Sequence, residues 1–390
     1  MNRVSSVKPK VLEAAQAHAT VVDGRNVIML AANNYLGLTN HPEVIKAVKA
    51  AVERYGAGLG CGRGLVSMRL QLELEERIAK FKKTEASLVF PTGYDTNLGA
   101  IWALTGKDSV LICDEFNHAS VFDAAKLSQA RLKVYGHGDM RSLERMLKGL
   151  NEKRVFIITP GIFPLEGDIA RLPEIVELAE RYSATVYVDD AHAVGVLGQR
   201  GTGSVEHFGL QGRVDVQAGT LSKALASVGG YIAGSGDLRQ YLFKKARPFS
   251  QSTGHLAPPS VAAVIACLDI LEKDHSLLEQ LWKNATYFRE GLVDLGFDTG
   301  RSETPIIPVL LGNSSTAIEF SKRLFDEGIF SQPFFYPAVP EGKARLRTIV
   351  SATHTKPELD RALEAFDKVG KQLNILNGAW LPPQRSITSV

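Results

Sequence analysis

Four short segments of this sequence carry residue types that can do chemistry, and each follows an apolar run typical of a buried strand. The run VYV leads into Asp189 and His192, and GTLSKALASVGGY carries Lys223 among small and hydroxyl side chains. SLVF leads into Gly93, and the run LIC is soon followed by His118. Parallel α/β sheets bind ligands at the carboxyl ends of their strands, so we expect these residues to gather in one site.

Lys223 is a candidate for imine formation. Desolvation lowers the pKa of a lysine and frees its amine for attack on a carbonyl group. The hydroxyl groups of Thr220 and Ser222 lie beside it in the sequence and could donate hydrogen bonds to a phosphate. The alternative interpretation is an exposed lysine on a turn.

Asp189 and His118 each leave several roles open. A carboxylate at the end of a strand could bind a metal ion, cap a helix or hold a protonated ring nitrogen. The surrounding sequence has no further carboxylates or histidines arranged as metal ligands, so we expect no metal. His118 could be a general base, a metal ligand, a flat partner for an aromatic ring or a structural residue.

The segment SLVFPTGYDTNLGAI predicts an anion site. A strand runs into Thr92 and Gly93, and a helical pattern begins near Asp95. The first N–H groups of a helix have no partner within the helix and attract anions. The segment lacks the G-x-x-x-x-G-K pattern of a P-loop, and an ordinary strand-to-helix turn is the alternative.

The elements that must position these residues alternate between short apolar runs and amphipathic stretches, which predicts an α/β fold with a mainly parallel sheet flanked by helices. Strands are expected at 87–90, 110–113, 155–159 and 184–188, and helices at 42–56 and 172–182.

The last third of the chain predicts a smaller C-terminal α/β domain. It has one long helical pattern over 260–295, strands at 306–311 and 345–350, and helices at 316–326 and after Pro357. We therefore expect an N-terminal arm (1–45), a large domain (46–275), a small domain (276–380) and a loose tail (381–390).

Composition narrows the functional classes. The chain has 390 residues, 45 basic and 42 acidic side chains and no basic block, which argues against nucleic-acid binding. It has no apolar run long enough to span a membrane and no secretory signal pattern at its N-terminus. Three cysteines without C-x-x-C spacing indicate free thiols and a cytoplasmic protein.

Together, the four segments resemble the α-oxoamine synthase family of fold-type I pyridoxal-phosphate enzymes. The resemblance extends from ANNYLGLTNHP at 32–42 to ARLRTIVSATHT at 344–355. It implies a cofactor, pyridoxal 5'-phosphate, and a homodimer. It also implies a decarboxylative Claisen-type condensation of an α-amino acid with an acyl thioester, carried on coenzyme A or a carrier protein. The products would be an α-amino ketone, CO2 and a free thiol.

The resemblance also implies a role for each matching residue. Lys223 would hold the cofactor as a Schiff base and later take the α-proton of the substrate, and Asp189 would pair with the ring nitrogen. His118 would stack on the ring, and His192 would lie near its phenolic oxygen. The remaining implied contacts are Gly93, Tyr94 and Thr220 for the phosphate, Ser252 and Thr253 for the phosphate of the neighbouring subunit, and Arg347 with Asn33 for the substrate carboxylate.

The sequence departs from the family pattern at several points. Pro160 stands where the family usually has an acidic residue, Pro164 where it often has serine, and Gln71 where it commonly has histidine. The STGHLAP segment is longer than usual and the N-terminal arm is short. We expect these departures to cluster near the second substrate, implying either an unusual acyl donor or another electrophile.

Two alternatives remain at this point. One is an aminotransferase or another carbon–carbon bond-forming pyridoxal enzyme on the same scaffold. The other is a non-catalytic subunit, which the retention of Lys223 argues against.

Overall fold

The computed structural model describes residues 9–150 and 154–376, and the chain divides into two compact units. The central unit is Asn34–Glu279, and the terminal unit combines Met1–Asn33 with Gln280–Val390. These limits differ from the expected ones, because the N-terminal segment pairs with the C-terminal part of the chain instead of standing as a separate arm. The predicted tail at 381–390 lies outside the described residues.

The central unit is built on a seven-stranded sheet with the order β3-β9-β8-β7-β6-β4-β5. Its strands are β3 (Ala86–Phe90), β4 (Ser109–Asp114), β5 (Arg131–Tyr135), β6 (Arg154–Pro160), β7 (Thr185–Asp189), β8 (Val216–Thr220) and β9 (Gly230–Gly234). All neighbours pair in parallel except β9, which is antiparallel to both β3 and β8. The four predicted strands and the mainly parallel α/β sheet are confirmed.

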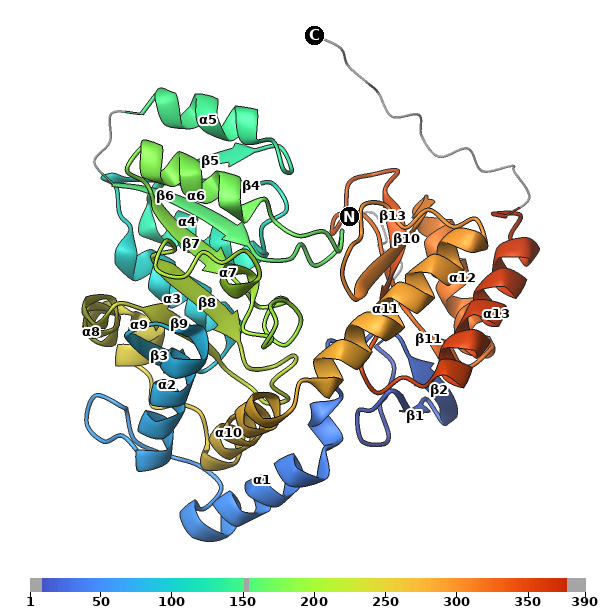
Figure 1. Cartoon of the computed structure of the whole chain (residues 1–390), viewed down its shortest axis with the longest axis horizontal. Coiled ribbons are helices and arrows are strands. Elements are labelled where there is room, and N and C mark those ends of the chain that lie inside the picture. The colour runs from blue at the N-terminus through green and yellow to red at the C-terminus, as the bar shows by residue number, and fades with distance from the viewer. Residues whose placement is uncertain (1–8, 151–153, 377–390) are drawn as a thin grey trace, which may run out of the picture. The chain divides into compact units, whose positions relative to one another are not determined.

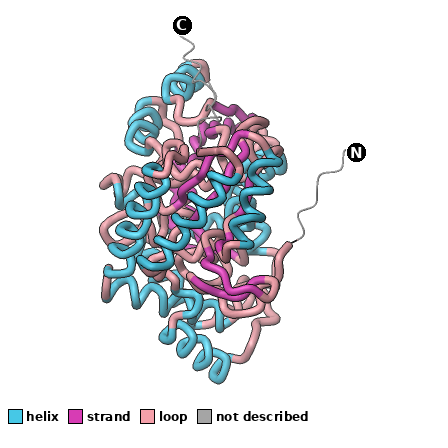
Figure 2. The backbone as a smooth tube through the Cα atoms, turned by 90° about the vertical axis from the view of Figure 1, so that its right-hand side faces the viewer, coloured by secondary structure: helices cyan, strands magenta, loops and turns pink. Residues whose placement is uncertain are grey.

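Helices cover both faces of this sheet (Figure 1), and Figure 2 colours the helices and strands of the chain. On one face, α3 (Gly93–Leu104), α4 (Ala119–Ser128), α8 (Gly236–Lys245) and α9 (Arg247–Ser250) share a core with alternate strand residues such as Leu111 and Cys113. On the other, α5 (Met140–Lys148), α6 (Leu172–Arg181) and α7 (Ser204–His207) pack on the intervening residues, such as Val110 and Ile112. Because side chains alternate along a strand, strands buried on both faces are continuously apolar, as the sequence shows. The remaining elements of the unit are η1 (Leu38–Asn40), α1 (Pro42–Tyr55), α2 (Arg69–Lys82) and α10 (Pro258–Lys273).

The terminal unit contains two three-stranded sheets. One has the order β1-β2-β11, with β1 (Ala19–Val22), β2 (Arg25–Met29) and β11 (Ile329–Phe330), and β2 pairs with β11 in parallel. The other has the order β10-β13-β12, with β10 (Ile306–Gly312), β12 (Gln332–Phe334) and β13 (Ala344–Ile349). The helices α12 (Ser314–Asp326) and α13 (Lys356–Gln372) and most of α11 (Ser276–Asp294) complete this unit.

The single long helical pattern predicted over 260–295 is wrong, because two helices occupy it. Asp274 follows α10 with an extended backbone, φ −150° and ψ 128°. Its carboxylate accepts hydrogen bonds from the backbone N–H (2.8 Å) and the hydroxyl (2.6 Å) of Ser276. A short acidic side chain that binds the first N–H groups of a helix favours a new helix start over continuation.

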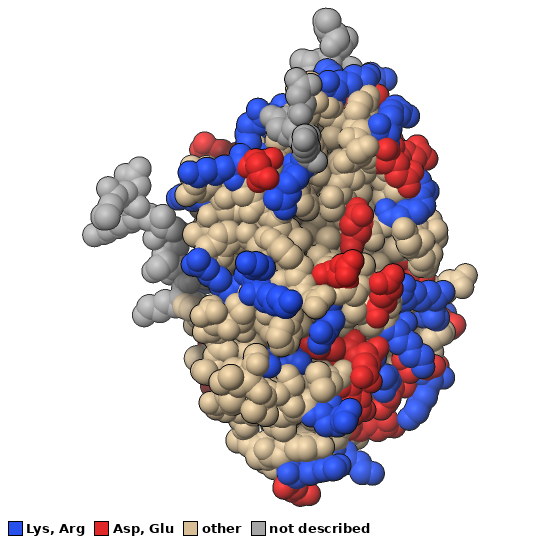
Figure 3. Space-filling view, turned by 90° about the vertical axis from the view of Figure 1, so that its left-hand side faces the viewer, with Lys and Arg blue, Asp and Glu red and all other residues tan. Residues whose placement is uncertain are grey.

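Charge is mixed on the molecular surface. On the face that Figure 3 draws, acidic side chains occur among the basic ones, and neither sign forms a continuous surface. Within residues 9–150 and 154–376, no helix is long and apolar enough to cross a membrane.

Candidate active site

The carboxyl ends of the central strands surround a cavity of about 250 Å³ in the central unit. Seven of the predicted site residues line it: Gly93, Tyr94, His118, Asp189, His192, Thr220 and Lys223. The other lining residues are Thr92, Asn97, Pro160, Ile162, Pro164, Ala191, Gly219 and Ser222. The expectation that the four segments converge is therefore confirmed.

The first turn of α3 forms one end of this cavity. Thr92 caps the helix, since its hydroxyl oxygen accepts a hydrogen bond from the N–H of Asp95 (3.0 Å), and the helix begins at Gly93, two residues before the predicted start. A Cβ atom on Gly93 would lie 3.0 Å from Oγ1 of Thr220, so a larger residue would push the turn away from β8. Thr220 Oγ1 lies 2.8 Å from the Ser222 hydroxyl. Thr220 Oγ1 also donates to the carbonyl of Gly229 (3.0 Å), so the helix N–H groups and the Ser222 hydroxyl are the donors that this end of the cavity offers to a phosphate.

Asp189 ends β7 and is 9% exposed. One carboxylate oxygen accepts a hydrogen bond from Nδ2 of Asn97 (2.7 Å), and the other from the N–H of Ala191 (3.0 Å). The Tyr187 hydroxyl donates to Oδ1 of Asn97 (2.7 Å). Burial, followed by the charge of Asp189, raises the pKa of Tyr187 well above its usual value, so the hydroxyl stays protonated as a donor. This chain of bonds fixes the orientation of the Asp189 carboxylate.

Lys223 lies in the tight connection between the antiparallel strands β8 and β9. The connection is closed by hydrogen bonds from the N–H of Leu221 to the carbonyl of Gly229 (2.9 Å) and from the N–H of Ala226 to the carbonyl of Lys223 (3.1 Å). Ala226 adopts a left-handed conformation, with φ 53°. The lysine therefore projects from a constrained loop into the cavity, which differs from the exposed turn considered as its alternative.

The two histidines of the cavity are held by different partners. His118 caps α4, and its Nδ1 lies 2.8 Å from the hydroxyl of Ser120. Its ring remains exposed and meets Tyr94 edge-on, with 6.2 Å between ring centroids. Nδ1 of His192 lies 2.7 Å from the hydroxyl of Tyr35, a fully buried residue.

Four predicted site residues do not line this cavity. Ser252 binds its own loop through the N–H of Gly254 (3.0 Å), and Thr253 is exposed. Asn33 and Arg347 belong to the terminal unit. There Arg347 is 9% exposed on β13, and its guanidinium lies over the ring of Phe334, 4.7 Å from the centroid.

The residues that depart from the family pattern lie in different places in the structure. Pro160 and Pro164 line the cavity and present an apolar wall without backbone donors. Gln71 does not line it, because its amide is fully buried and donates a hydrogen bond to the carbonyl of Leu256 (3.0 Å). Gln71 thereby joins α2 to the segment before α10, and the expectation that these departures lie near the second substrate stays a prediction.

The cavity suits pyridoxal 5'-phosphate. Its donors at α3 and Ser222 fit a phosphate, the carboxylate of Asp189 fits a protonated ring nitrogen, and the amine of Lys223 fits an aldehyde. The exposed ring of His118 offers a flat surface for stacking.

Sequence reasoning missed Asn97 and Tyr35. Asn97 lies four residues after Gly93, so one helical turn brings it to the same side of α3, and this spacing was a usable signal. Tyr35 lies 157 residues from His192, and nothing in the local sequence indicates that contact.

The sequence of this chain is similar to that of known enzymes. Residues 25–366 match the family described as aminotransferase class I and II. The chain is 53% identical over 372 residues to the 8-amino-7-oxononanoate synthase of Thermoanaerobacter pseudethanolicus, covering 95% of this chain and 94% of that one. It is 48% identical over 370 residues to 8-amino-7-oxononanoate synthase 1 of Bacillus subtilis, covering 94% of both chains.

The chain also superimposes on solved structures of similar enzymes. The serine palmitoyltransferase of Sphingomonas wittichii superimposes with a TM-score of 0.91 at 30% identity, covering 94% of this chain and 93% of that one. The 8-amino-7-oxononanoate synthase of Francisella tularensis superimposes with a TM-score of 0.77 at 27% identity, covering 89% and 98%.

Proposed function

Since the chain belongs to the class I and II aminotransferase family and, within it, to the α-oxoamine synthases, we propose which substrates it joins and which residues act on them. The chain is a pyridoxal-phosphate-dependent acyltransferase. It condenses an α-amino acid with an acyl thioester and releases CO2 and a free thiol, leaving an α-amino ketone.

The identity of 53% over nearly the whole chain carries the substrate proposal. In 8-amino-7-oxononanoate, the product that names these relatives, the ketone carbon must come from the thioester carbonyl. The carbons up to and including the ketone therefore come from a seven-carbon acyl group that ends in a carboxylate. The amino carbon and its methyl group remain from alanine after loss of CO2. We infer that alanine and this ω-carboxy acyl thioester are the substrates.

Residues of the cavity would hold the cofactor and move one proton. The bound cofactor supplies a conjugated ring that delocalises the negative charge developing on the amino-acid α-carbon. The Asp189 carboxylate would keep the ring nitrogen protonated, and His118 would restrain the ring from one face. Nζ of Lys223 would take the α-proton. His192 would approach the phenolic oxygen, with its own ring held by Tyr35.

Other residues would position the substrate and the phosphate. Gly93, Tyr94 and Thr220 would bind the phosphate, and Ser252 and Thr253 would reach the phosphate of a second subunit. Arg347, helped by Asn33, would bind the substrate carboxylate, a task that suits the bidentate geometry of a guanidinium.

Two further proposals concern the state of the protein. We infer a homodimer. Ser252 and Thr253 do not line the cavity of their own chain, so they are available to bind the phosphate in the cavity of a second subunit. We infer a cytoplasmic location, because Cys61, Cys113 and Cys267 are all free thiols, which persist in reducing compartments.

Product analysis tests the substrate proposal. The purified enzyme is mixed with alanine and the seven-carbon ω-carboxy acyl thioester, on coenzyme A and on a carrier protein in separate arms. We expect equal amounts of CO2, free thiol and an amino ketone with the mass of 8-amino-7-oxononanoate. Lys223→Ala serves as the matched inactive control.

Serine with a palmitoyl thioester is the competing pair, favoured by the serine palmitoyltransferase structures that share the fold. Faster product formation from serine and the palmitoyl thioester than from alanine and the seven-carbon thioester would overturn the proposal. Release of a keto acid without CO2 would indicate transamination instead.

A further inference from the structure

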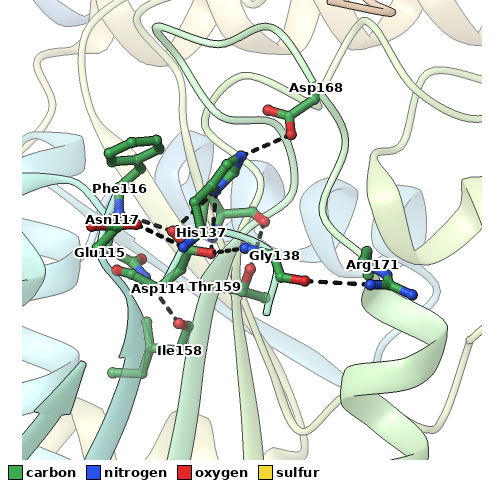
Figure 4. A network of polar contacts seen from close by, with 11 residues as sticks. Asp114, Glu115, Phe116, Asn117, His137, Gly138, Ile158, Thr159, Asp168 and Arg171 are labelled. Carbon is green, nitrogen blue, oxygen red and sulfur yellow. Dashed lines mark hydrogen bonds and ion pairs between the residues drawn. The ribbon is translucent and has the colours of Figure 1, made fainter. Parts of the chain in front are cut away.

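A partly buried ion-pair network lies at the carboxyl ends of three neighbouring strands (Figure 4). His137, just after β5, places Nδ1 3.2 Å from the carboxylate of Asp114 at the end of β4. Its Nε2 lies 2.9 Å from the carboxylate of Asp168, in the segment that follows β6. The strand order puts β5, β4 and β6 side by side, so one imidazole connects the ends of all three.

The contacts of His137 require a protonated ring. A neutral imidazole has one donor and one acceptor nitrogen, whereas a carboxylate can only accept, so two carboxylates on two nitrogens call for the imidazolium. Burial lowers the pKa of His137, but the hydrogen bonds to Asp114 and Asp168 outweigh it and raise the pKa to about 10. Phe116 (4.7 Å between centroids) and Phe163 (4.4 Å) flank the ring and limit its contact with water.

The Asp114 side of the network shapes the turn that carries His118. One Asp114 oxygen accepts a hydrogen bond from the N–H of Phe116 (2.9 Å), and the other from the N–H of Gly138 (2.8 Å). Asn117 in the same turn donates to the carbonyl of Ile158 on β6 (3.0 Å). The next residue is His118, which lines the cavity.

The Asp168 side holds another wall of the same cavity. Residues 161–170 form a closed turn, with hydrogen bonds from the N–H of Phe163 to the carbonyl of Asp168 (3.0 Å) and from the N–H of Gly167 to the carbonyl of Phe163 (2.9 Å). Ile162 and Pro164 line the cavity, whereas Phe163 between them packs on His137.

Asp168 depends on His137. Its side chain is 14% exposed, and its second oxygen has no hydrogen-bond partner among the residues that the structure describes. Removing the imidazolium would leave a half-enclosed carboxylate without its cation, and the turn would move to hydrate it.

We propose that His137 is a positioning residue that ties the His118 turn to the 161–170 turn and so sets the width of the cofactor cavity between them. The geometry argues against two other roles. None of Asp114, His137 and Asp168 lines the cavity, so none touches the reacting atoms. The carboxylates bind opposite nitrogens of one ring, so they do not converge on a common metal ion.

Cofactor affinity tests this proposal without reference to the substrates. Three variants, His137→Gln, Asp168→Asn and the double variant, are stripped of cofactor and titrated with pyridoxal 5'-phosphate. Hydrogen exchange is measured on the loaded proteins by mass spectrometry. His207→Gln is the matched control, because His207 is exposed, meets Phe208 edge-on at 4.7 Å and does not line the cavity.

We expect each single variant to bind the cofactor about three- to tenfold more weakly, the scale of one weakened hydrogen bond. The double variant should bind no more weakly than the worse single variant, because both changes break the same link. Exchange should rise in residues 161–170 in both single variants, and at 116–120 in His137→Gln. The control should match the native protein.

A folded His137→Gln protein with native cofactor affinity and native exchange would overturn the proposal, even if its melting temperature fell, because the residue would then be structural only. If His137→Gln does not fold, Asp168→Asn decides: native affinity and exchange in that variant overturn the proposal, and weaker binding supports it. Because only the cofactor is used, failure of the alanine condensation would leave this result unaffected.

Discussion

Asp189 and Asp190 are adjacent in the chain, yet the structure predicts different effects when each is changed to asparagine. Asp189→Asn should lose turnover, whereas Asp190→Asn should lose stability. Asp189 faces the cofactor cavity, whereas Asp190 is fully buried and does not line it. The Asp190 carboxylate accepts hydrogen bonds from Nζ of Lys82 (2.8 Å) and from the hydroxyl of Ser204 (2.5 Å). The two substitutions are equal in size and chemistry, so each is the control for the other.

Asp189→Asn would disturb the local hydrogen bonds and weaken the contact with the cofactor. Both oxygens accept from donors, Nδ2 of Asn97 and the N–H of Ala191, so an amide would turn its NH2 group toward one of them. Asn97 cannot rotate to repair this without losing the bond from Tyr187. The substitution also removes the negative charge that would face the ring nitrogen of the cofactor. One charge-assisted hydrogen bond to that nitrogen is worth about 1.5–3 kcal/mol, so its loss predicts cofactor binding about ten- to a hundredfold weaker.

Turnover should fall further than cofactor affinity in Asp189→Asn. An amide can hydrogen-bond the ring nitrogen, but it carries no negative charge to keep that nitrogen protonated. With cofactor at saturating concentration, we therefore expect most activity to be lost while the protein remains folded.

The expected result for Asp190→Asn is a loss of stability. The Lys82 side chain is 1% exposed, so its ammonium would stay buried opposite a neutral amide. Breaking one partner of a buried pair costs about 3–5 kcal/mol of unfolding free energy. Denaturant titration measures this quantity, and steady-state product formation measures turnover. Turnover of Asp189→Asn within about threefold of native at saturating cofactor would refute the role of the Asp189 charge in keeping the ring nitrogen protonated.

Three further predictions can be tested separately. Lys223→Ala should abolish turnover and the covalent cofactor link, and borohydride reduction followed by peptide mapping should label Lys223 in the native protein and no other lysine. Arg347→Ala should weaken amino-acid binding about ten- to a hundredfold while cofactor binding survives, and Arg347→Lys should restore the binding in part. The amino-acid-induced change in the cofactor spectrum measures this affinity, and an unchanged affinity would contradict the role of Arg347. The pKa of His137 is raised from 6.5 to about 10, so its stabilisation is complete below about pH 6.5 and is lost as pH rises toward 10. The free energy of unfolding should therefore fall more steeply between pH 6.5 and 10 in the native protein than in His137→Gln. Parallel curves of unfolding free energy against pH would contradict the ion pairs of His137 with Asp114 and Asp168.

Sequence alone placed the candidate catalytic and cofactor-binding residues at strand ends. Asp189, His118 and Gly93 directly or closely follow apolar runs that are strands in the structure, and Lys223 follows β8. This could be predicted because a buried strand and the amphipathic helix after it each have a local pattern, and parallel strands align their carboxyl ends.

Only the tertiary structure decided which distant residues meet. The pairing of β2 with β11 joins residues 28 and 329 and moves the N-terminal segment into the terminal unit. The contacts of Asn97 with Asp189, and of His137 with Asp114 and Asp168, likewise form across separate elements. The physical reason is that hydrophobic periodicity reports which face of an element is buried, but not which partner covers it. A buried polar side chain must then find its hydrogen-bond partner wherever the fold brings one within reach.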